Sequence, residues 1–205
     1  MQQKPKQIIF DFGGVLLDWH PDRVYRPYFR DDAAMQRFYE ETQILWHNRE
    51  LDRGMPFDKV LKTLTQEFPQ YSTPLQLWKT SWHKMLGGPI EGSIRVLYAL
   101  KRKGYRLFGL TNWAAETFPY VYYTYEFFHV FEDIVVSGRE GLIKPEPEIF
   151  HLCLERNQIL AADSIFIDDN ADNVRVSREL GMQAIHFRDA EALKAELEAM
   201  LQHQL

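Results

Sequence analysis

The sequence predicts an α/β fold, with a doubly wound parallel sheet and an inserted α-helical cap. From residue 87 onward, short apolar runs alternate with stretches of helical periodicity, which is the pattern of parallel strands joined by crossover helices. A further apolar run, at residues 8–10, is separated from this part by a helical block. We therefore expect residues 1–17 and 87–205 to form a Rossmann-like core and residues 18–86 to form a cap domain.

The first predicted strand, Ile8-Ile9-Phe10, stops at Asp11 and is followed by Gly13-Gly14. This order puts a carboxylate at the carboxyl end of a strand, where an open α/β sheet has its ligand crevice. The glycines let backbone groups approach a ligand closely. Taken alone, the segment fits a turn after a core strand as well as it fits a ligand site.

The block that follows the first strand is expected to be purely helical. Apolar residues recur at helical spacing between residues 35 and 46 and again between residues 60 and 68. The Ser-Thr-Pro stretch at residues 72–74 is a typical helix start, and the Gly-Gly-Pro stretch at residues 87–89 ends the pattern.

Strands and helices alternate in the rest of the chain. We expect strands over residues 105–110, 131–136, 164–167 and 182–187. We expect helices over residues 94–100, 146–157, 174–180 and 193–201. The tyrosine-rich run at residues 120–128 fits either a packed surface or a partner-binding face.

Composition excludes several classes of protein. The 205 residues are 45% hydrophobic and 26% charged, the balance of a globular protein, and their net charge of −5 argues against non-specific nucleic-acid binding. No apolar stretch reaches the roughly 18 residues of a membrane span, and no secretory signal opens the chain. Cys153 is the single cysteine, so no internal disulfide can form. We expect a cytoplasmic protein with Cys153 in its core; the oligomeric state stays open.

Polar residues follow four of the predicted elements, and all of them belong to one edge of the sheet. They are Asp11, the pair Thr111-Asn112, Lys144 and the pair Asp168-Asp169. Carboxylates from two strands can share a hard cation such as Mg²⁺. A hydroxyl group and backbone amides can hold an anion, and a lysine can neutralise both carboxylates and a phosphate. This set suits phosphoryl transfer, in which positioning and charge stabilisation supply most of the catalysis.

With these motifs in this order, nearly the whole chain resembles the haloacid dehalogenase superfamily of phosphohydrolases, in the subgroup with a helical cap after the first strand. The stretch at residues 168–173 is similar to that of sugar-phosphate phosphatases in this group. The resemblance implies a magnesium-dependent phosphatase of a small phosphorylated metabolite, such as a sugar phosphate, that works through an aspartyl-phosphate intermediate.

The resemblance also implies a role for each catalytic residue. Asp11 is the nucleophile, and Thr111 binds the transferring phosphoryl oxygens with help from the backbone of Asn112. Lys144 neutralises charge and contacts the same phosphoryl group.

The implied magnesium ligands come from the first and the last motif. Asp169 is a direct ligand, and Asp168 is a second or water-mediated one. Asp11 and the backbone carbonyl of Gly13 are further ligands, while Asn173 orients the loop of the last motif.

Gly13 departs from the pattern of the family. Family phosphatases commonly carry an aspartate at this position, which protonates the leaving group and is worth about 10²–10⁴-fold in rate. We therefore expect a lower rate with the function retained. Asp18 and His20 lie just beyond and could substitute, although both fit ordinary hinge residues at the start of the cap.

The cap stretch at residues 46–54 fits either a helix end or a specificity loop, in which Arg49 or Arg53 would meet the substrate. Two other functions are compatible with the motifs. In a 2-haloacid dehalogenase Asp11 would attack carbon without a metal, which the acidic pair Asp168-Asp169 argues against. A phosphate-binding regulatory protein could have lost turnover when Gly13 replaced the acid.

Overall fold

The computed structural model describes residues 7–205, and its centre is a five-stranded parallel sheet. The strands are β1 (Gln7–Phe10), β4 (Arg106–Thr111), β5 (Asp133–Val136), β6 (Ser164–Asp168) and β7 (Gln183–His186). Their spatial order is β5-β4-β1-β6-β7, so the chain winds outward from β1 to β5 and then continues on the other side of β1. This confirms the predicted doubly wound sheet. The point where the winding reverses, at the carboxyl end of β1, is where such sheets bind ligands.

The central strand owes its position to its continuous apolar sequence. Ile8, Ile9 and Phe10 are at most 1% exposed, because both faces of a parallel sheet are covered by helices. Ile8 pairs in register with Leu107 of β4 and with Ile165 of β6.

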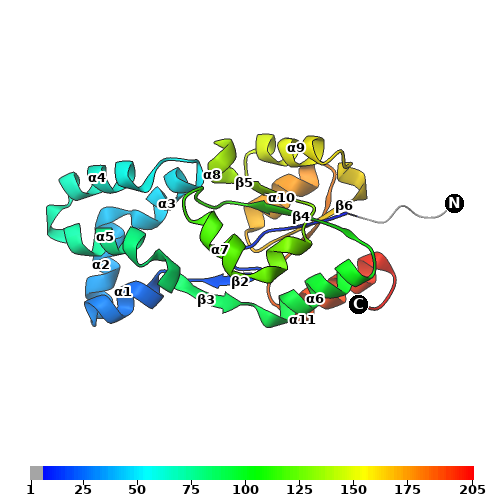
Figure 1. The fold of residues 1–205 in the computed structure, drawn as a ribbon, viewed down its shortest axis with the longest axis horizontal. Helices are drawn as coiled ribbons and strands as arrows, with labels where there is room; N and C mark the ends of the chain where they lie inside the picture. Colours follow the sequence, from blue (N-terminus) through cyan, green and yellow to red (C-terminus); the bar gives the residue numbers. More distant parts are fainter. Residues whose placement is uncertain (1–6) are drawn as a thin grey trace.

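Helices cover both faces of the sheet, as Figure 1 shows. One face carries α6 (Glu91–Arg102), α7 (Phe118–Thr124) and α11 (Ala190–Leu201). The other face carries α9 (Pro147–Arg156) and α10 (Ala171–Glu179), and the short α8 (Ser137–Glu140) follows β5. Cys153 of α9 is buried in the apolar layer between that helix and the sheet, as predicted.

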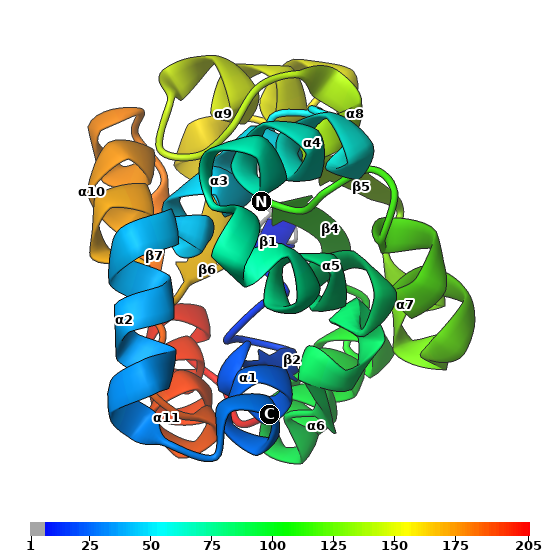
Figure 2. The same ribbon diagram turned by 90° about the vertical axis from the view of Figure 1, so that its left-hand side faces the viewer.

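Five helices lie together beyond the carboxyl end of β1 (Figures 1 and 2). They are α1 (Asp22–Phe29), α2 (Asp32–Thr42), α3 (Ile44–Asp52), α4 (Phe57–Glu67) and α5 (Ser72–Thr80). We propose on this arrangement that residues 18–86 form a cap domain over a core of residues 1–17 and 87–205. Residues 1–6 of that core lie outside the described residues.

Short 3-10 helices complete the described structure. They span Pro69–Tyr71, Trp82–Met85, Glu126–Val130 and Ala161–Asp163. Within residues 7–205, no helix has the length and the apolar character needed to cross a membrane.

The expectation of a purely helical segment at residues 18–86 is wrong at both of its ends. Strands β2 (Leu17–Trp19) and β3 (Leu86–Pro89) form an antiparallel ribbon, in which Leu17 pairs with Pro89. The chain enters the cap along one strand and returns along the other, so the two connections run in opposite directions and satisfy each other's backbone groups.

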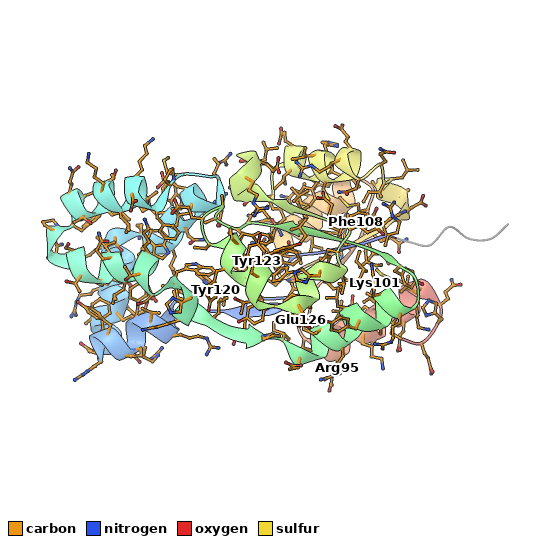
Figure 3. All side chains as sticks on the ribbon, viewed as in Figure 1. Arg95, Lys101, Phe108, Tyr120, Tyr123 and Glu126 are labelled. Atoms are coloured by element: carbon orange, nitrogen blue, oxygen red, sulfur yellow. The ribbon has the colours of Figure 1, made fainter. Side chains whose placement is uncertain are left out.

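The tyrosine-rich run is packed on one side and open on the other. Phe127 and Phe128 are buried, whereas Tyr120 and Tyr123, labelled on α7 in Figure 3, are 47% and 81% exposed. The sequence analysis missed α7 itself, because its aromatic and β-branched residues have modest helix propensity.

Candidate active site

A cavity of about 390 Å³ opens at the carboxyl edge of the sheet, between the core and the cap helices. Its core-side lining includes Asp11, Gly13, Asn112, Lys144 and Asp169. The structure therefore brings residues from all four predicted motifs to one place, although more than 150 residues of sequence separate the first motif from the last.

Lys144 is the electrostatic centre of this cavity. Its ammonium group is buried and lies 2.9 Å from Asp11 Oδ1 and 2.7 Å from Asp168 Oδ2, and it donates to the carbonyl oxygen of Leu110 at 2.8 Å. Burial disfavours the charged form, but Asp11 and Asp168 outweigh burial and raise the pKa of Lys144 above its ordinary value. Lys144 is therefore held as a cation between two carboxylates.

Asp11 is oriented so that one oxygen is held and the other is available. Oδ1 accepts the Phe12 N–H at 2.7 Å and contacts Lys144, and among residues 7–205 both hydrogen-bonding contacts of this carboxylate involve Oδ1. Burial, opposed by Lys144 and reinforced by Asp168 and Asp169, raises the pKa of Asp11 to about 7. Among the described residues, Oδ2 has no hydrogen-bond or ion-pair partner.

The two acids of the last motif occupy different environments. Asp168 is fully buried, and its oxygens accept hydrogen bonds from Asn173 Nδ2 at 3.0 Å and from the Asn170 N–H at 2.8 Å, in addition to Lys144. Asp169 is exposed to the cavity. Burial and the charge of Asp168 raise the pKa of Asp169.

Gly14 makes room for the Asp169 carboxylate. A Cβ atom at position 14 would lie 2.3 Å from Asp169 Oδ2, and the backbone φ of +74° is in the region that favours glycine. Gly14 thus lets the last motif approach the end of the first strand.

Three carboxylates, those of Asp11, Asp168 and Asp169, offer oxygen atoms within 4.8 Å of one another. The single ammonium group of Lys144 leaves this cluster with surplus negative charge. Carboxylate oxygens are the ligands that Mg²⁺ prefers, so the donor set fits a hard divalent cation.

The motif at the end of β4 contributes an unpaired hydroxyl group and an amide side chain that is hydrogen-bonded to the backbone of Lys144. Thr111 Oγ1 is buried and has no hydrogen-bond partner among the described residues, which is unfavourable unless a ligand supplies one. The Asn112 side chain accepts the Lys144 N–H at 2.8 Å and donates to the Lys144 carbonyl at 2.9 Å. Asn112 therefore fixes the backbone from which Lys144 reaches the cavity.

Arg49 and Arg53 lie outside this cavity. They line a neighbouring hollow of about 450 Å³, together with Glu50. Arg53 Nη1 donates to Glu146 Oε2 at 3.0 Å, which uses its charge in a link between the cap and the core. A role of either arginine in substrate binding stays a prediction.

The sequence analysis named the stretch at residues 46–54 but singled out its two arginines, whereas other residues of the cap line the cavity. Asn48 and Asp52 enter it from α3, four residues apart and hence on one helix face. Trp19, Trp82 and Trp113 form an aromatic part of its wall. The only available signal was the Asn48/Asp52 spacing, which does not reveal the direction in which that face points.

The turn after α3 fastens the cap to the core. Beside the Arg53–Glu146 pair, the Phe57 N–H donates to Glu116 Oε1 at 2.9 Å. Gly54 approaches the backbone of Gly138 so closely that a Cβ atom there would lie 2.7 Å from the Gly138 carbonyl oxygen. These contacts hold the end of α3 over the cavity.

Gly54→Ala is expected to loosen this fastening and to lower turnover. The φ of +94° strains any other residue, at about 1–3 kcal/mol, and the methyl group also meets the Gly138 backbone. Gly104→Ala is the matched control, because its φ is +81° but its Cβ meets no described atom within 4 Å. Thermal melts and kcat/KM check the difference. Equal destabilisation by both variants, with turnover unchanged, would contradict the role given to this turn.

Comparison with known proteins agrees with the geometry. A model of the haloacid dehalogenase-like hydrolases matches residues 8–187. The chain belongs to this family. The sesquiterpene phosphatase astK of Aspergillus oryzae is 26% identical over 205 residues, covering 96% of each chain. The D-ribitol-5-phosphate phosphatase of Bacteroides thetaiotaomicron is 27% identical and covers 96% of this chain and 98% of that protein.

A solved structure of the family has the same fold. A HAD family enzyme from Bacteroides thetaiotaomicron, in complex with magnesium and inorganic phosphate, aligns with a TM-score of 0.72 at 21% identity. The alignment covers 90% of this chain and 95% of that chain. The protein is thus a hydrolase of this family, and the shared architecture covers 90% of the chain.

Proposed function

We propose that this hydrolase is a magnesium-dependent phosphatase, which cleaves a small phosphate monoester through an aspartyl-phosphate on Asp11. The observation that supports it best is the position of Lys144 between Asp11 and Asp168, beside the cavity-facing Asp169. A nucleophile, a cation and a surplus of carboxylates in one cavity fit phosphoryl transfer.

The reaction follows from the atoms available. Asp11 Oδ2 attacks phosphorus, the bond from phosphorus to the ester oxygen breaks, and the leaving oxygen takes a proton. Thr111 Oγ1 and Lys144 Nζ donate to the phosphoryl oxygens as charge develops on them. Water then attacks phosphorus, which releases phosphate and restores the Asp11 carboxylate.

Asp169, Asp11, the carbonyl of Gly13 and, directly or through water, Asp168 would hold the cation. Bound Mg²⁺ would neutralise the phosphoryl oxygens and offset the surplus carboxylate charge. The buried contacts of Asp168 with Lys144 and Asn173 favour the water-mediated role for this residue.

The lining of the cavity favours a hydroxylated leaving group. Trp19, Trp82 and Trp113 offer faces for the C–H groups of a sugar or polyol, and Asn48 offers an amide for hydroxyl groups. D-ribitol-5-phosphate, on which one relative acts, is a ligand of this kind. We propose that the substrate is a sugar or polyol phosphate. We also propose that the enzyme is cytoplasmic and that neither nucleic acid nor a membrane is its partner.

Phosphate release from a panel of phosphorylated metabolites, with Mg²⁺ and with a chelator, tests this proposal. We expect turnover of at least one sugar or polyol phosphate that stops when the chelator is added. If the protein instead released chloride from a 2-chloroacid in the absence of metal, the result would support the alternative function of a 2-haloacid dehalogenase. Phosphate binding with no turnover of any substrate would support a regulatory protein.

Substitutions of the two neighbouring acids are expected to affect different properties, Mg²⁺ binding for Asp169 and stability for Asp168. Asp169→Asn should remove Mg²⁺ binding and leave stability nearly unchanged, because its side chain faces the cavity. Asp168→Asn should lower the free energy of unfolding by about 1–3 kcal/mol, because Asp168 also accepts from Asn170 and Asn173 and the buried NH₂ group of an amide would face donors there. Calorimetric titration with MgCl₂ and denaturant unfolding measure both effects. A larger loss of Mg²⁺ affinity in Asp168→Asn would reverse this assignment.

A further inference from the structure

We propose that Asp52 of the cap protonates the leaving oxygen, and so does the work of the acid for which core position 13 has only a glycine. This inference rests on the proposed phosphatase function. Asp52 ends α3 and lines the same cavity as Asp11 and Gly13. The structure therefore offers a carboxyl group from the cap at a site where the core strand offers none.

The surroundings of Asp52 suit a group that gives and takes a proton. The residue is 9% exposed, and the one hydrogen bond of its side chain among the described residues is from Asn48 Nδ2 to Oδ2 at 3.0 Å, which leaves Oδ1 available. Burial raises the pKa of Asp52 to about 7, against the opposing effects of Asn48, Lys144 and Arg49. An acid that titrates near neutral pH is well matched to proton transfer at that pH.

Asp52 is also held in place. It directly precedes the turn that fastens the cap to the core through Arg53–Glu146, through the Gly54–Gly138 approach and through Phe57–Glu116. A catalytic carboxyl group needs such fixed geometry, because proton transfer requires hydrogen-bond distance to the leaving oxygen.

The other acids and bases considered for proton transfer have other partners or other roles. Asp18 pairs with Arg23, and the His20 side chain is 60% exposed beside Asp22. Among the described residues that line the cavity, the carboxylates are Asp11, Asp52 and Asp169. Asp11 is the nucleophile and Asp169 belongs to the cation site, so Asp52 is the carboxyl group left for proton transfer.

Asp52 gives up one proton in the first step and regains one in the second. As Asp11 Oδ2 bonds to phosphorus, the bond to the ester oxygen breaks and that oxygen takes the proton of Asp52. In the second step Asp52, now a carboxylate, accepts a proton from the water that attacks phosphorus. Phosphate leaves, and both aspartates return to their starting states.

The test compares two phosphate esters that differ in their need for a proton. For Asp52→Asn, kcat/KM for a simple alkyl phosphate without other hydroxyl groups should fall by about 10²–10⁴-fold. For 4-nitrophenyl phosphate, whose leaving group needs no proton, kcat/KM should change less than about 3-fold. Glu50→Gln is the matched control, because Glu50 is on the same helix but lines the neighbouring hollow.

A rescue variant separates acid catalysis from a structural role. A Cβ atom at Gly13 meets no described atom outside its chain neighbours closer than Trp113 Cζ3 at 4.0 Å, so the first side-chain atom has room there. Gly13→Asp combined with Asp52→Asn should recover most of the lost alkyl phosphatase activity.

Equal losses on both esters, or no loss on the alkyl ester, would overturn the role of Asp52. A loss confined to sugar phosphates would show that Asp52 binds a substrate hydroxyl, which also overturns it. A wild-type chain that cleaves neither of these esters nor any sugar or polyol phosphate of the metabolite panel refutes the proposed function itself and this inference with it.

Stability provides a readout that does not need activity. The pKa of Asp52 rises from 3.8 to about 7 on folding, so its stabilising contribution is complete below the lower value and is lost as the pH rises through the higher one. Asparagine does not titrate. The Tm of Asp52→Asn relative to wild type should therefore increase by about 5–10 °C between about pH 5 and about pH 8. A constant difference would contradict the buried, titrating carboxyl group.

Discussion

Asp11→Asn is expected to lower kcat by about 10⁴-fold or more, because an amide cannot form the bond to phosphorus. The fold should be retained, since the oxygen of the introduced amide can still accept from the Phe12 N–H and from Lys144, which keeps its contacts with Asp168 and Leu110. Steady-state kinetics and thermal melts measure the two effects.

Asp58→Asn is the control for this substitution. It makes the same chemical change in the cap, on a side chain that is 82% exposed. Its turnover should equal that of the wild type. Substantial phosphatase activity in a folded Asp11→Asn protein would remove Asp11 as the nucleophile.

Lys144→Met is expected to reduce both stability and activity. It removes the cation between two buried carboxylates, and the loss of one partner from a buried ion pair lowers the free energy of unfolding by about 3–5 kcal/mol. Loss of a preorganised donor to the phosphoryl group should reduce kcat by about 10²–10³-fold in the fraction that remains folded. Denaturant unfolding and kinetics at a temperature well below the Tm separate the two effects.

Lys194→Met is the matched control, because its side chain is 51% exposed and its nearest carboxylate, of Glu198, is 3.8 Å away. It should change stability by less than about 0.5 kcal/mol. If Lys144→Met were as stable as this control, the ammonium group would not be holding the two carboxylates together.

The core side of this site could be predicted because its polar side chains come at the ends of strands, which the sequence shows as apolar runs. Asp11, Thr111 and Asp168 each end or follow a buried apolar run, and the carboxyl ends of parallel strands meet at one edge. The different environments of Asp168 and Asp169 follow from strand geometry, since successive side chains point in opposite directions. Which of the two faces the cavity depends on the register of β6 in the sheet.

The cap side of the site could not be predicted in the same way. Arg49 and Arg53 share one helical spacing and Asn48 and Asp52 share another, and the two faces differ by about 100° of rotation around α3. Tertiary packing at Gly54 and Gly138 decides which face meets the cavity, and no local pattern records that contact. The ribbon of β2 and β3 was missed for a similar reason, because its partners are far apart in the sequence.

The covalent step on Asp11 is the central claim, and mass spectrometry of the protein during turnover tests it most directly. The reaction with Mg²⁺ and a phosphate monoester would be stopped with acid and the protein digested with pepsin at low pH, because an acyl phosphate hydrolyses at the alkaline pH that trypsin needs. We predict that the peptide that contains Asp11 gains the mass of one phosphoryl group at this residue, and that this species disappears when the substrate is exhausted. Rapid phosphate release without any phosphorylated peptide, or a phosphoryl group at another residue, would contradict the account.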